Sequence, residues 1–306
     1  MKSGFVSVIG RPNVGKSTLL NSIIGEKIAI ASDKPQTTRN QIRGILNTGD
    51  DKEEYQMIFI DTPGIHKPKT KLGKYMTGTA LDTFKEVDAI LFLVDSPLTD
   101  TAFKDDVSAK GGDSFILESI KDIDTPKILI INKIDTMDPV RFKKIYETYD
   151  SMDIFHEVIG ISALDGTHVE RIIESLKPMM EDGPRYFPGD MITDHPERFI
   201  VTEIIREKIL MYLDKEVPHG VAVEIEKYEE TSKITKISAV IYTEKKSHKG
   251  IIIGKEGRKL KGIGKSAREE IEALLGNKVY LELFVKVKEK WRDSDFMLNS
   301  LGYKDK

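Results

Sequence analysis

The 306-residue sequence predicts an α/β domain with a mostly parallel, doubly wound sheet, followed by a smaller α+β domain. Through residue 176, short apolar segments alternate with longer amphipathic ones, as buried parallel strands alternate with their connecting helices. A proline-rich stretch then interrupts this pattern. Beyond it, a helical segment precedes two segments that alternate apolar and polar residues, which is typical of a small α+β domain.

In the first domain, five short apolar runs have the length and composition of buried strands. They are Phe5–Ile9, Met57–Ile60, Ala89–Val94, Lys127–Ile131 and Val158–Ile161. Apolar residues have helical spacing at Ser17–Ile24 and at Val169–Leu176. We expect Ile42–Asn47 to form an additional strand that pairs as a hairpin with Tyr55–Ile60.

Proline marks the boundary between the domains. Four of the 12 prolines, together with Gly183 and Gly189, lie between residues 178 and 196, and this composition is typical of a linker. We therefore expect a first domain at 1–177, a linker at 178–196 and a second domain at 197–306.

The second domain is predicted to have the element order α-β-β-α-β. Its segments are a helix, two strands, a glycine-rich stretch, a helix and a strand: Arg198–Leu213, Val221–Tyr228, Ile234–Tyr242, Gly254–Gly257, Ser266–Leu275 and Val279–Val287.

Composition excludes several classes of protein. Hydrophobic residues make up 39% and charged residues 32% of the chain, as in ordinary soluble proteins. Without cysteine there are no disulfides or thiolate metal sites, and the six histidines do not pair at metal-ligand spacing. No apolar run approaches the roughly 20 residues that cross a bilayer, and no signal sequence is recognised, so we expect a cytoplasmic protein.

The net charge of −3 is unevenly distributed. Residues 1–184 carry 23 basic and 29 acidic side chains, whereas residues 185–306 carry 24 basic and 21 acidic ones. The second part is therefore the better candidate for a polyanionic partner.

Residues 10–17, GRPNVGKS, match the pattern G-x-x-x-x-G-K-[S/T] between a predicted strand and a predicted helix. Its glycines let backbone N–H groups surround phosphates, and the helix N-terminus adds its positive end. In this pattern Lys16 reaches the β- and γ-phosphates, and the Ser17 hydroxyl binds Mg²⁺. The expected nucleotide contacts are Gly10, Arg11, Pro12, Asn13, Val14, Gly15, Lys16, Ser17 and Thr18.

A second motif, DTPG at residues 61–64, follows the predicted strand Met57–Ile60. A carboxylate at the end of a buried strand suits Asp61 to hold Mg²⁺ through water. Gly64 can donate its N–H to a γ-phosphate oxygen and can move when that group leaves. The nucleotide contacts expected here are Asp61, Thr62, Pro63, Gly64 and Ile65.

A third motif, Asn132-Lys133-Ile134-Asp135, follows the strand Lys127–Ile131 and selects the base. The Asp135 carboxylate can accept hydrogen bonds from guanine N1–H and from the N2 amine. Adenine would leave that charge unpaired, which discriminates by roughly 10⁴ or more. The Lys133 stem can cover the purine, and Asn132 can tie this loop to the phosphate loop. The alternative is that Asp135 caps a helix.

A fourth motif follows the strand Val158–Ile161, where a backbone N–H of Ser162 or Ala163 can reach guanine O6. The four motifs stand in the order that guanine-nucleotide sites require. Together they predict binding and hydrolysis of GTP.

The segment PQTTR at residues 35–39 lies between the first helix and the Ile42 strand. A threonine hydroxyl there can complete the Mg²⁺ shell, which makes residues 30–41 a candidate switch. Spacing to the strand favours Thr38 over Thr37; the alternative is a solvated loop without a fixed ligand. The predicted Mg²⁺ ligands are Ser17, Thr38 and Asp61, and the predicted catalytic residues are Lys16, Thr38, Asp61 and Gly64.

The residue after DTPG is Ile65, where many GTPases have glutamine. An aliphatic side chain can neither orient nor deprotonate water. We therefore expect slow intrinsic turnover that a partner or a monovalent cation accelerates. Asn13 is a candidate ligand for K⁺.

Residues 245–265 hold eight basic side chains and a single acid, Glu256. A G-x-x-G loop lies at their centre, between an apolar turn and a basic helix. Such a loop lets an RNA backbone approach closely while an apolar groove receives bases. The predicted RNA contacts are Lys249, Gly250, Ile252, Gly254, Lys255, Glu256, Gly257, Arg258 and Lys261. The lone Trp291 is more often a core anchor than a base-stacking residue.

This motif order, with the second-domain segment GIIIGKEGRKLKGIG and the late VKVKEKWRD, resembles the Era GTPases of bacteria over essentially the whole chain. The resemblance implies a P-loop GTPase domain fused to a type II KH domain. It implies GTP-dependent assembly of the small ribosomal subunit, with the KH domain bound near the 3′ end of 16S rRNA. It also implies a cytoplasmic protein with a fraction loosely associated with the inner membrane. Relatives share the aliphatic residue after DTPG, so the resemblance implies that Ile65 does not indicate an inactive enzyme. The stretch Phe103–Asp113 departs from the family by its length.

Two alternatives remain from the sequence. One is a GTPase that acts on another RNA, such as tRNA, or at the membrane in cell-cycle control. The other is an RNA-binding protein that uses GTP only as a structural ligand, which the intact Lys16, Ser17 and Asp61 disfavour. We expect a monomer with no small-molecule substrate beyond GTP.

Overall fold

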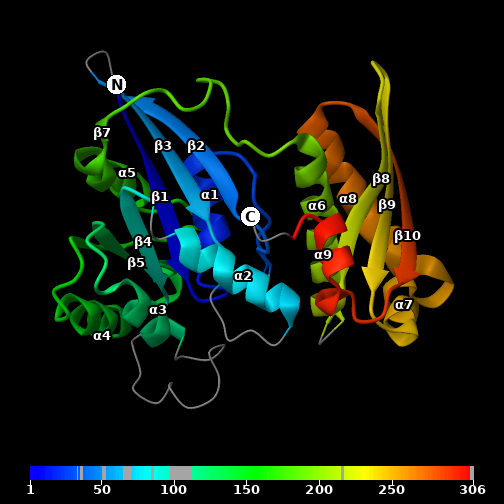
Figure 1. The fold of residues 1–306 in the computed structure, drawn as a ribbon, viewed down its shortest axis with the longest axis horizontal. Helices are drawn as coiled ribbons and strands as arrows, with labels where there is room; N and C mark the ends of the chain where they lie inside the picture. The colour runs from blue at the N-terminus through cyan, green and yellow to red at the C-terminus, as the bar shows by residue number, and fades with distance from the viewer. Residues whose placement is uncertain are drawn as a thin grey trace. The chain divides into compact units, whose positions relative to one another are not determined.

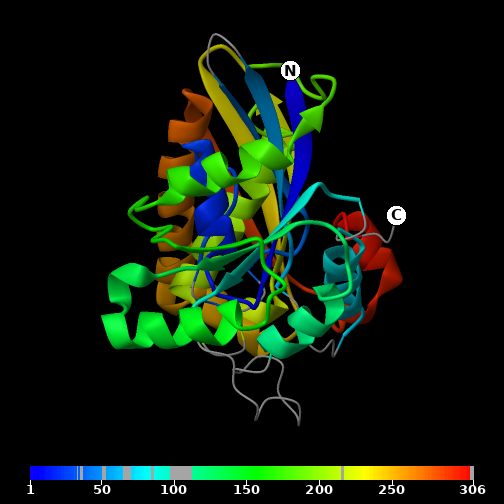
Figure 2. The ribbon, with the colours of Figure 1, turned by 90° about the vertical axis from the view of Figure 1, so that its left-hand side faces the viewer.

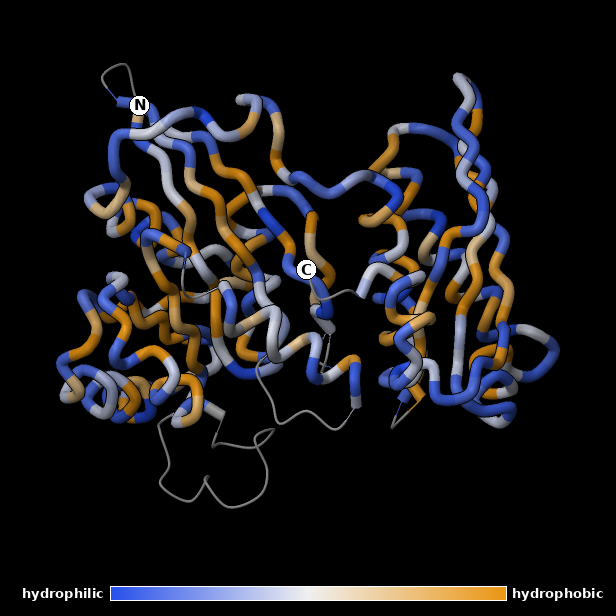
Figure 3. Tube along the Cα trace, viewed as in Figure 1, coloured by the Kyte–Doolittle hydropathy of each residue, from blue (hydrophilic) through white to orange (hydrophobic). Residues whose placement is uncertain are grey.

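The computed structural model describes residues 1–32, 34, 37–49, 53–64, 70–83, 86–96, 112–214 and 217–303. The chain divides into two compact units, formed chiefly by residues 1–194 and by residues 195–306 (Figure 1). Figure 3 shows that apolar residues gather in the interior of each unit. In the described parts of the chain, no helix is both long and apolar enough to cross a membrane.

The first unit is built on a mostly parallel sheet with the strand order β2-β3-β1-β4-β5-β6. Only β2 runs antiparallel along this path, and it pairs with β3 as the sequence predicts. The short β7 pairs antiparallel with β1. The strands are β1 Lys2–Gly10, β2 Ile42–Gly49, β3 Glu54–Asp61, β4 Ala89–Val94, β5 Lys127–Ile131, β6 Glu157–Gly160 and β7 Glu181–Asp182.

Helices cover both faces of this sheet. All six side chains of β4 are buried, and successive side chains of a strand point to opposite faces, so neither face is open to water. On one face α3 and α4 are neighbours that share a core cluster with β4 and β5 (Figures 1 and 2). The helices are α1 Lys16–Ile24, α2 Lys71–Asp82, α3 Gly112–Ile120, α4 Pro139–Asp150 and α5 Val169–Leu176. The predicted doubly wound α/β fold is confirmed.

The parallel strands all end at the same edge of the sheet, where ligands bind in folds of this kind. The loops that follow β1, β3, β4, β5 and β6 therefore converge. Three of the four predicted motifs begin directly after one of these strands or at its last residue, and the fourth begins after one intervening residue.

The second unit has the element order α-β-β-α-α-β followed by a short terminal helix. Its sheet has the order β10-β9-β8, with β9 antiparallel to β8 and parallel to β10. The elements are α6 Glu197–Tyr212, β8 Ala222–Glu230, β9 Ile234–Thr243, α7 Lys246–Ile253, α8 Arg258–Leu275, β10 Lys278–Val287 and α9 Asp295–Ser300.

The prediction of a single helix between the second and third strands of this unit is wrong. The segment before the G-x-x-G loop, expected as an apolar turn, is part of α7, Lys246–Ile253, and α8 begins at Arg258 instead of near Ser266. Gly250 and three consecutive β-branched isoleucines are poor helix formers, so local propensity hides α7. Packing outweighs that propensity, because Ile252 enters the core.

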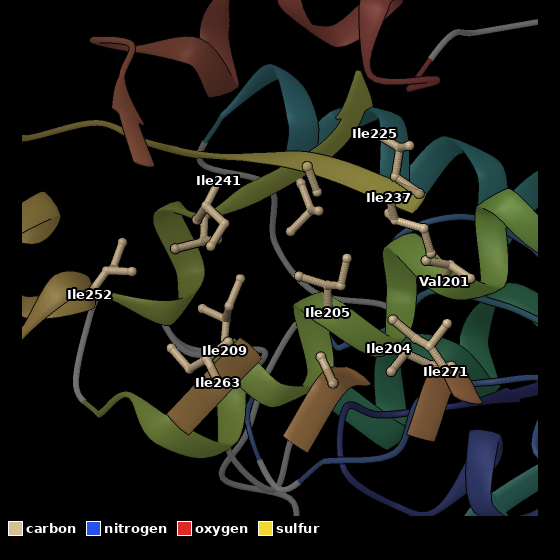
Figure 4. Close-up of a cluster of buried hydrophobic side chains, with 14 of the residues drawn as sticks. Val201, Ile204, Ile205, Ile209, Ile225, Ile237, Ile241, Ile252, Ile263 and Ile271 are labelled. Carbon is tan, nitrogen blue, oxygen red and sulfur yellow. The ribbon is translucent and has the colours of Figure 1, made fainter. Parts of the chain in front are cut away.

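Isoleucine dominates the core of the second unit (Figure 4). Side chains of α6 such as Ile205 and Ile209 meet Ile237 and Ile241 of the sheet, while Ile263 approaches from α8. Trp291 is fully buried, and its Nε1–H donates to the Gly220 carbonyl oxygen at 2.8 Å. The prediction that Trp291 is a core anchor is confirmed.

Candidate functional site

The GRPNVGKS segment forms the turn between β1 and α1, with Lys16, Ser17 and Thr18 in the first turn of α1. Gly15 has φ 103°, which disfavours any residue with a side chain, and a Cβ there would collide with the Asn132 amide. Glycine at this position therefore lets the phosphate loop and the loop after β5 approach closely.

Lys16 is buried with 6% of its surface exposed. Its Nζ donates to the carbonyl oxygens of Gly10 at 3.1 Å and Arg11 at 3.0 Å, so the ammonium lies inside the curve of the phosphate loop. Burial lowers the pKa of Lys16 to about 8, although nearby Asp61 acts in the opposite direction.

Ser17, Thr38 and Asp61 converge from three separate elements. Ser17 Oγ donates to Asp61 Oδ2 at 2.6 Å and lies 2.9 Å from Thr38 Oγ1, which is 3.3 Å from the same carboxylate oxygen. Asp61 is completely buried, and burial raises its pKa while Lys16 and the two hydroxyls oppose that shift. Its other oxygen, Oδ1, is buried and has no hydrogen-bond partner among the described residues. Two hydroxyls and a carboxylate with an unused oxygen fit Mg²⁺, which prefers oxygen ligands.

The rest of the DTPG motif lies against the phosphate loop. Thr62 and Pro63 are buried, and Thr62 Oγ1 donates to the Val8 carbonyl oxygen at 3.0 Å. A Cβ on Gly64 would come within 2.8 Å of the Pro12 ring and within 2.9 Å of the Pro12 nitrogen. Ile65 lies outside the described residues, as do Pro35 and Gln36 of the PQTTR segment and residues 103–111 of the long stretch.

Asn132 connects three loops. Its Nδ2 donates to the Val14 carbonyl oxygen at 2.7 Å, and its Oδ1 accepts from the Ala163 N–H at 2.9 Å. The phosphate loop, the loop after β5 and the loop after β6 are thus held together by one amide side chain. Ser162 and Ala163 are both buried there.

Asp135 lies in a 3₁₀ turn, Ile134–Thr136, with an exposed side chain. The cap of the following helix α4 is Asp138, whose carboxylate accepts from the Arg141 N–H at 2.8 Å. The alternative that Asp135 caps this helix is therefore wrong. The preceding Lys133 extends its Nζ to the Asn13 carbonyl oxygen at 2.7 Å.

Two acidic residues near the nucleotide loops, Asp95 and Asp113, were not predicted. Asp95, the first residue after β4, contacts both Arg11 and Lys133, and Arg11 also forms an ion pair with buried Asp113 on α3. Burial raises the pKa of Asp113 to about 6, against the influence of Arg11. The position of Asp95 directly after a buried strand was a sequence signal, but its contacts with Arg11 and Lys133 depend on the strand order.

The G-x-x-G loop of the second unit joins α7 to α8. Gly254, Glu256 and Gly257 all have positive φ, at 71°, 54° and 73°, which gives the tight turn that brings two helix ends together. Lys255 and Glu256 are exposed. The other exposed members of the predicted RNA surface are Lys249, Gly250, Arg258 and Lys261.

The prediction that Ile252 contacts RNA needs correction. Its side chain is fully buried in the core of the second unit, whereas the preceding Ile251 is 44% exposed. The helical conformation of α7 explains why Ile251 is exposed and Ile252 is buried, because neighbouring helix residues point about 100° apart. Ile252 supports the loop from beneath, and Ile251 is the apolar side chain available at the surface.

Fold and site together define a P-loop GTPase unit followed by a KH unit. The family described as "50S ribosome-binding GTPase" matches residues 5–133, and the KH domain family matches residues 216–292. The chain is 58% identical to the GTPase Era of Alkaliphilus oremlandii over 304 residues, covering 99% of each chain. It is 54% identical to the GTPase Era of Clostridioides difficile over 308 residues, covering 100% of this chain and 99% of the relative. The chain belongs to the Era family of GTPases.

Two solved structures are similar over the full length of both chains, each with 38% sequence identity. One is a variant of Aquifex aeolicus Era bound to GDP and AlF4⁻, with a TM-score of 0.90. The other is Era in complex with MgGDPNP and nucleotides 1506–1542 of 16S ribosomal RNA, with a TM-score of 0.91.

Proposed function

We propose that this GTPase is a switch that binds 16S rRNA near its 3′ end and assists assembly of the small ribosomal subunit. The observation that carries the proposal is the Ser17–Thr38–Asp61 cluster beside buried Lys16, in a chain that also presents an exposed basic G-x-x-G loop. The similarity to an Era structure that contains both MgGDPNP and a 16S rRNA fragment supports the pairing of these two features.

On the nucleotide side, the phosphate loop and Lys16 bind the β- and γ-phosphates. Ser17, Thr38 and Asp61 would hold Mg²⁺, which would neutralise phosphate charge during the transfer. The short contact of Thr38 with Ser17 supports its preference over Thr37 as the switch residue. Gly64 packs closely against Pro12 of the phosphate loop, and we propose that its N–H donates to the γ-phosphate.

On the base side, exposed Asp135 accepts from guanine N1–H and N2. Asn132 ties this loop to the phosphate loop through Val14, and its Oδ1 accepts from the Ala163 N–H in the loop that we propose faces guanine O6. The remaining finer proposal is K⁺ bound by Asn13, an exposed residue of the phosphate loop whose side chain oxygen is a suitable ligand for that cation. Slow turnover that K⁺ or the RNA partner accelerates follows from Ile65 at the position where other GTPases use glutamine.

The RNA side uses the exposed lysines and arginine of the G-x-x-G loop for phosphates and Ile251 for bases. We also propose a monomer in the cytoplasm, and the family resemblance adds a fraction in peripheral contact with the membrane.

We propose that the bound nucleotide affects RNA binding through the segment that leads to the second unit. Residues 185–194 lie along the β2–β3 hairpin: Phe187 exchanges two hydrogen bonds with Gln56, at 2.8 and 3.0 Å, and the Ile45 N–H donates to Ile192 at 2.8 Å. At the end of this segment Asp194 forms an ion pair with Arg43 at 2.7 Å. The same hairpin starts just after Thr38 and ends at Asp61, so a change at the γ-phosphate reaches the connecting segment through two strands.

Two measurements on the full chain test the proposal. A single-turnover assay with labelled GTP should show hydrolysis, and an RNA copy of the 3′ end of 16S rRNA should bind more tightly than a scrambled RNA of equal length. We expect the specific RNA to bind more tightly with Mg-GDPNP than with GDP. Equal affinity in the two states would contradict the switch, and equal affinity for the scrambled RNA would contradict the assigned RNA partner.

A further inference from the structure

Asp95 lies between the phosphate loop and the base-selecting loop because of the strand order of the sheet. In the strand order, β4 lies between β1, which leads into the phosphate loop, and β5, which leads into the base-selecting loop. Asp95 is the first residue after β4, and the preceding Val94 carbonyl oxygen accepts from the Asn132 N–H at 2.8 Å. A side chain at this position can therefore reach both loops.

The two carboxylate oxygens of Asp95 are used by different loops. Oδ1 accepts from Arg11 Nη2 in the phosphate loop at 2.9 Å, and Oδ2 accepts from Lys133 Nζ in the base loop at 2.8 Å. Each interaction is a charge-assisted hydrogen bond. Asp95 is 22% exposed and Arg11 11%, so water screens their contact weakly, whereas Lys133 is 40% exposed and its contact is screened more.

Both cations are themselves held in place. Arg11 Nη2 also donates to Ser96 Oγ at 2.8 Å, and its Nε lies 2.7 Å from Oδ2 of Asp113, which is completely buried. Lys133 has a positive φ of 66°, and its Nζ also donates to the Asn13 carbonyl oxygen. Asp95 thus connects two cationic side chains, Arg11 and Lys133, that other contacts already hold in position.

We propose that Asp95 is a positioning residue that sets the spacing between the phosphate loop and the guanine loop. A nucleotide has a fixed length, so it gains full affinity only when both loops stand at that spacing before it arrives. Without the Asp95 charge, the Arg11 and Lys133 cations repel each other, and the two loops are left with the contacts that Asn132 and the Lys133 ammonium make with the phosphate loop. This inference rests on the proposed binding of guanine nucleotides at the site.

The test uses D95N, which keeps the shape of the side chain and removes its charge. We expect the dissociation constant for Mg-GDP to rise about tenfold or more, because two charge-assisted hydrogen bonds are weakened. The matched control is D88N, at the opposite end of β4, where the Asp88 carboxylate accepts from the Phe5 N–H at 2.7 Å. The control should leave GDP affinity within about twofold of wild type, while thermal melting reports the fold of each variant.

A double-mutant cycle separates positioning from general support of the fold. If Asp95 acts through Lys133, the effects of D95N and K133M on GDP affinity should be clearly less than additive; a purely structural role predicts additivity. D95E, which retains the charge, should recover part of the affinity, and D95A replaces D95N in the cycle if D95N does not fold. Unchanged GDP affinity in D95N, or additive effects, would overturn the role of Asp95. A wild-type chain that fails to bind GDP would instead contradict the proposed function itself.

Discussion

The nucleotide site of the first unit and the G-x-x-G surface of the second handle charge in opposite ways. Lys16 is 6% exposed and Asp61 is completely buried, and both are held by specific hydrogen bonds. Lys255, Arg258 and Lys261 are exposed to water. The first arrangement suits a small ligand of fixed shape, whereas the second suits a flexible polyanion that many weak contacts attract.

This difference determines how each region should respond to mutation. In the buried site every charged group makes hydrogen bonds to its neighbours. One substitution therefore disturbs several contacts, and the expected loss of nucleotide binding or hydrolysis is large. At the surface each cation contributes separately, and salt screens it. Substitutions in the buried nucleotide site and on the exposed RNA surface should therefore differ in the size of their effect and in their salt dependence.

The largest effect is expected from K16M. Removal of the ammonium that lies inside the phosphate loop should lower the single-turnover rate of GTP hydrolysis by about 100-fold or more, because the cation that would face the transferred phosphate is lost. The control is K143A on the exposed face of α4, which removes a lysine that forms a surface ion pair with Glu147. A K16M rate within about tenfold of wild type would show that the buried cation is not the main source of phosphate stabilisation.

A smaller effect is expected from the triple variant K255A/R258A/K261A. RNA affinity should fall about 30-fold at moderate salt, and the slope of log affinity against log salt should become shallower by about two, since each phosphate contact on a single strand contributes about 0.7. GTP hydrolysis without RNA should be unchanged.

The control for this surface is K227A/K233A/K236A, which removes three exposed lysines from the β8–β9 hairpin of the same unit. If the control weakened RNA binding as much as the loop variant, net charge would explain the affinity and the G-x-x-G geometry would have no special role.

The two regions were also unequally predictable from sequence. The strands of the first unit are continuous apolar runs, and each motif is tied to the end of one of them, so strand positions and motif positions support each other. In the second unit α7 contains Gly250 and three isoleucines, and α8 contains Gly262 and Gly264, so both helices have weak local signals. Once α7 was taken as a turn, the direction of Ile252 could not be deduced.

Asp95 shows a different limit. It belongs to no motif, and its contacts with Arg11 and Lys133 arise because β4 lies between β1 and β5. Strand order is a long-range property that periodicity does not contain. The linker illustrates the same point, since its proline content marks a boundary but gives no indication that residues through Asp194 would pack along β2 and β3.

The smallest and most discriminating effect is expected from pH. Burial lowers the pKa of Lys16 to about 8, so its ammonium loses a proton as the pH rises above that value. Bound phosphates favour the charged form, so GTP binding takes up a proton in this range, and affinity should decline from about pH 7 to about pH 9 with a slope of at most one decade per pH unit. K16R retains its charge throughout and should remove the decline even if its affinity is lower overall. RNA affinity, measured over the same range, provides the comparison with the second region. If K16R showed the same decline as wild type, the titrating group would lie elsewhere in the site, and burial of Lys16 would not distinguish the two regions.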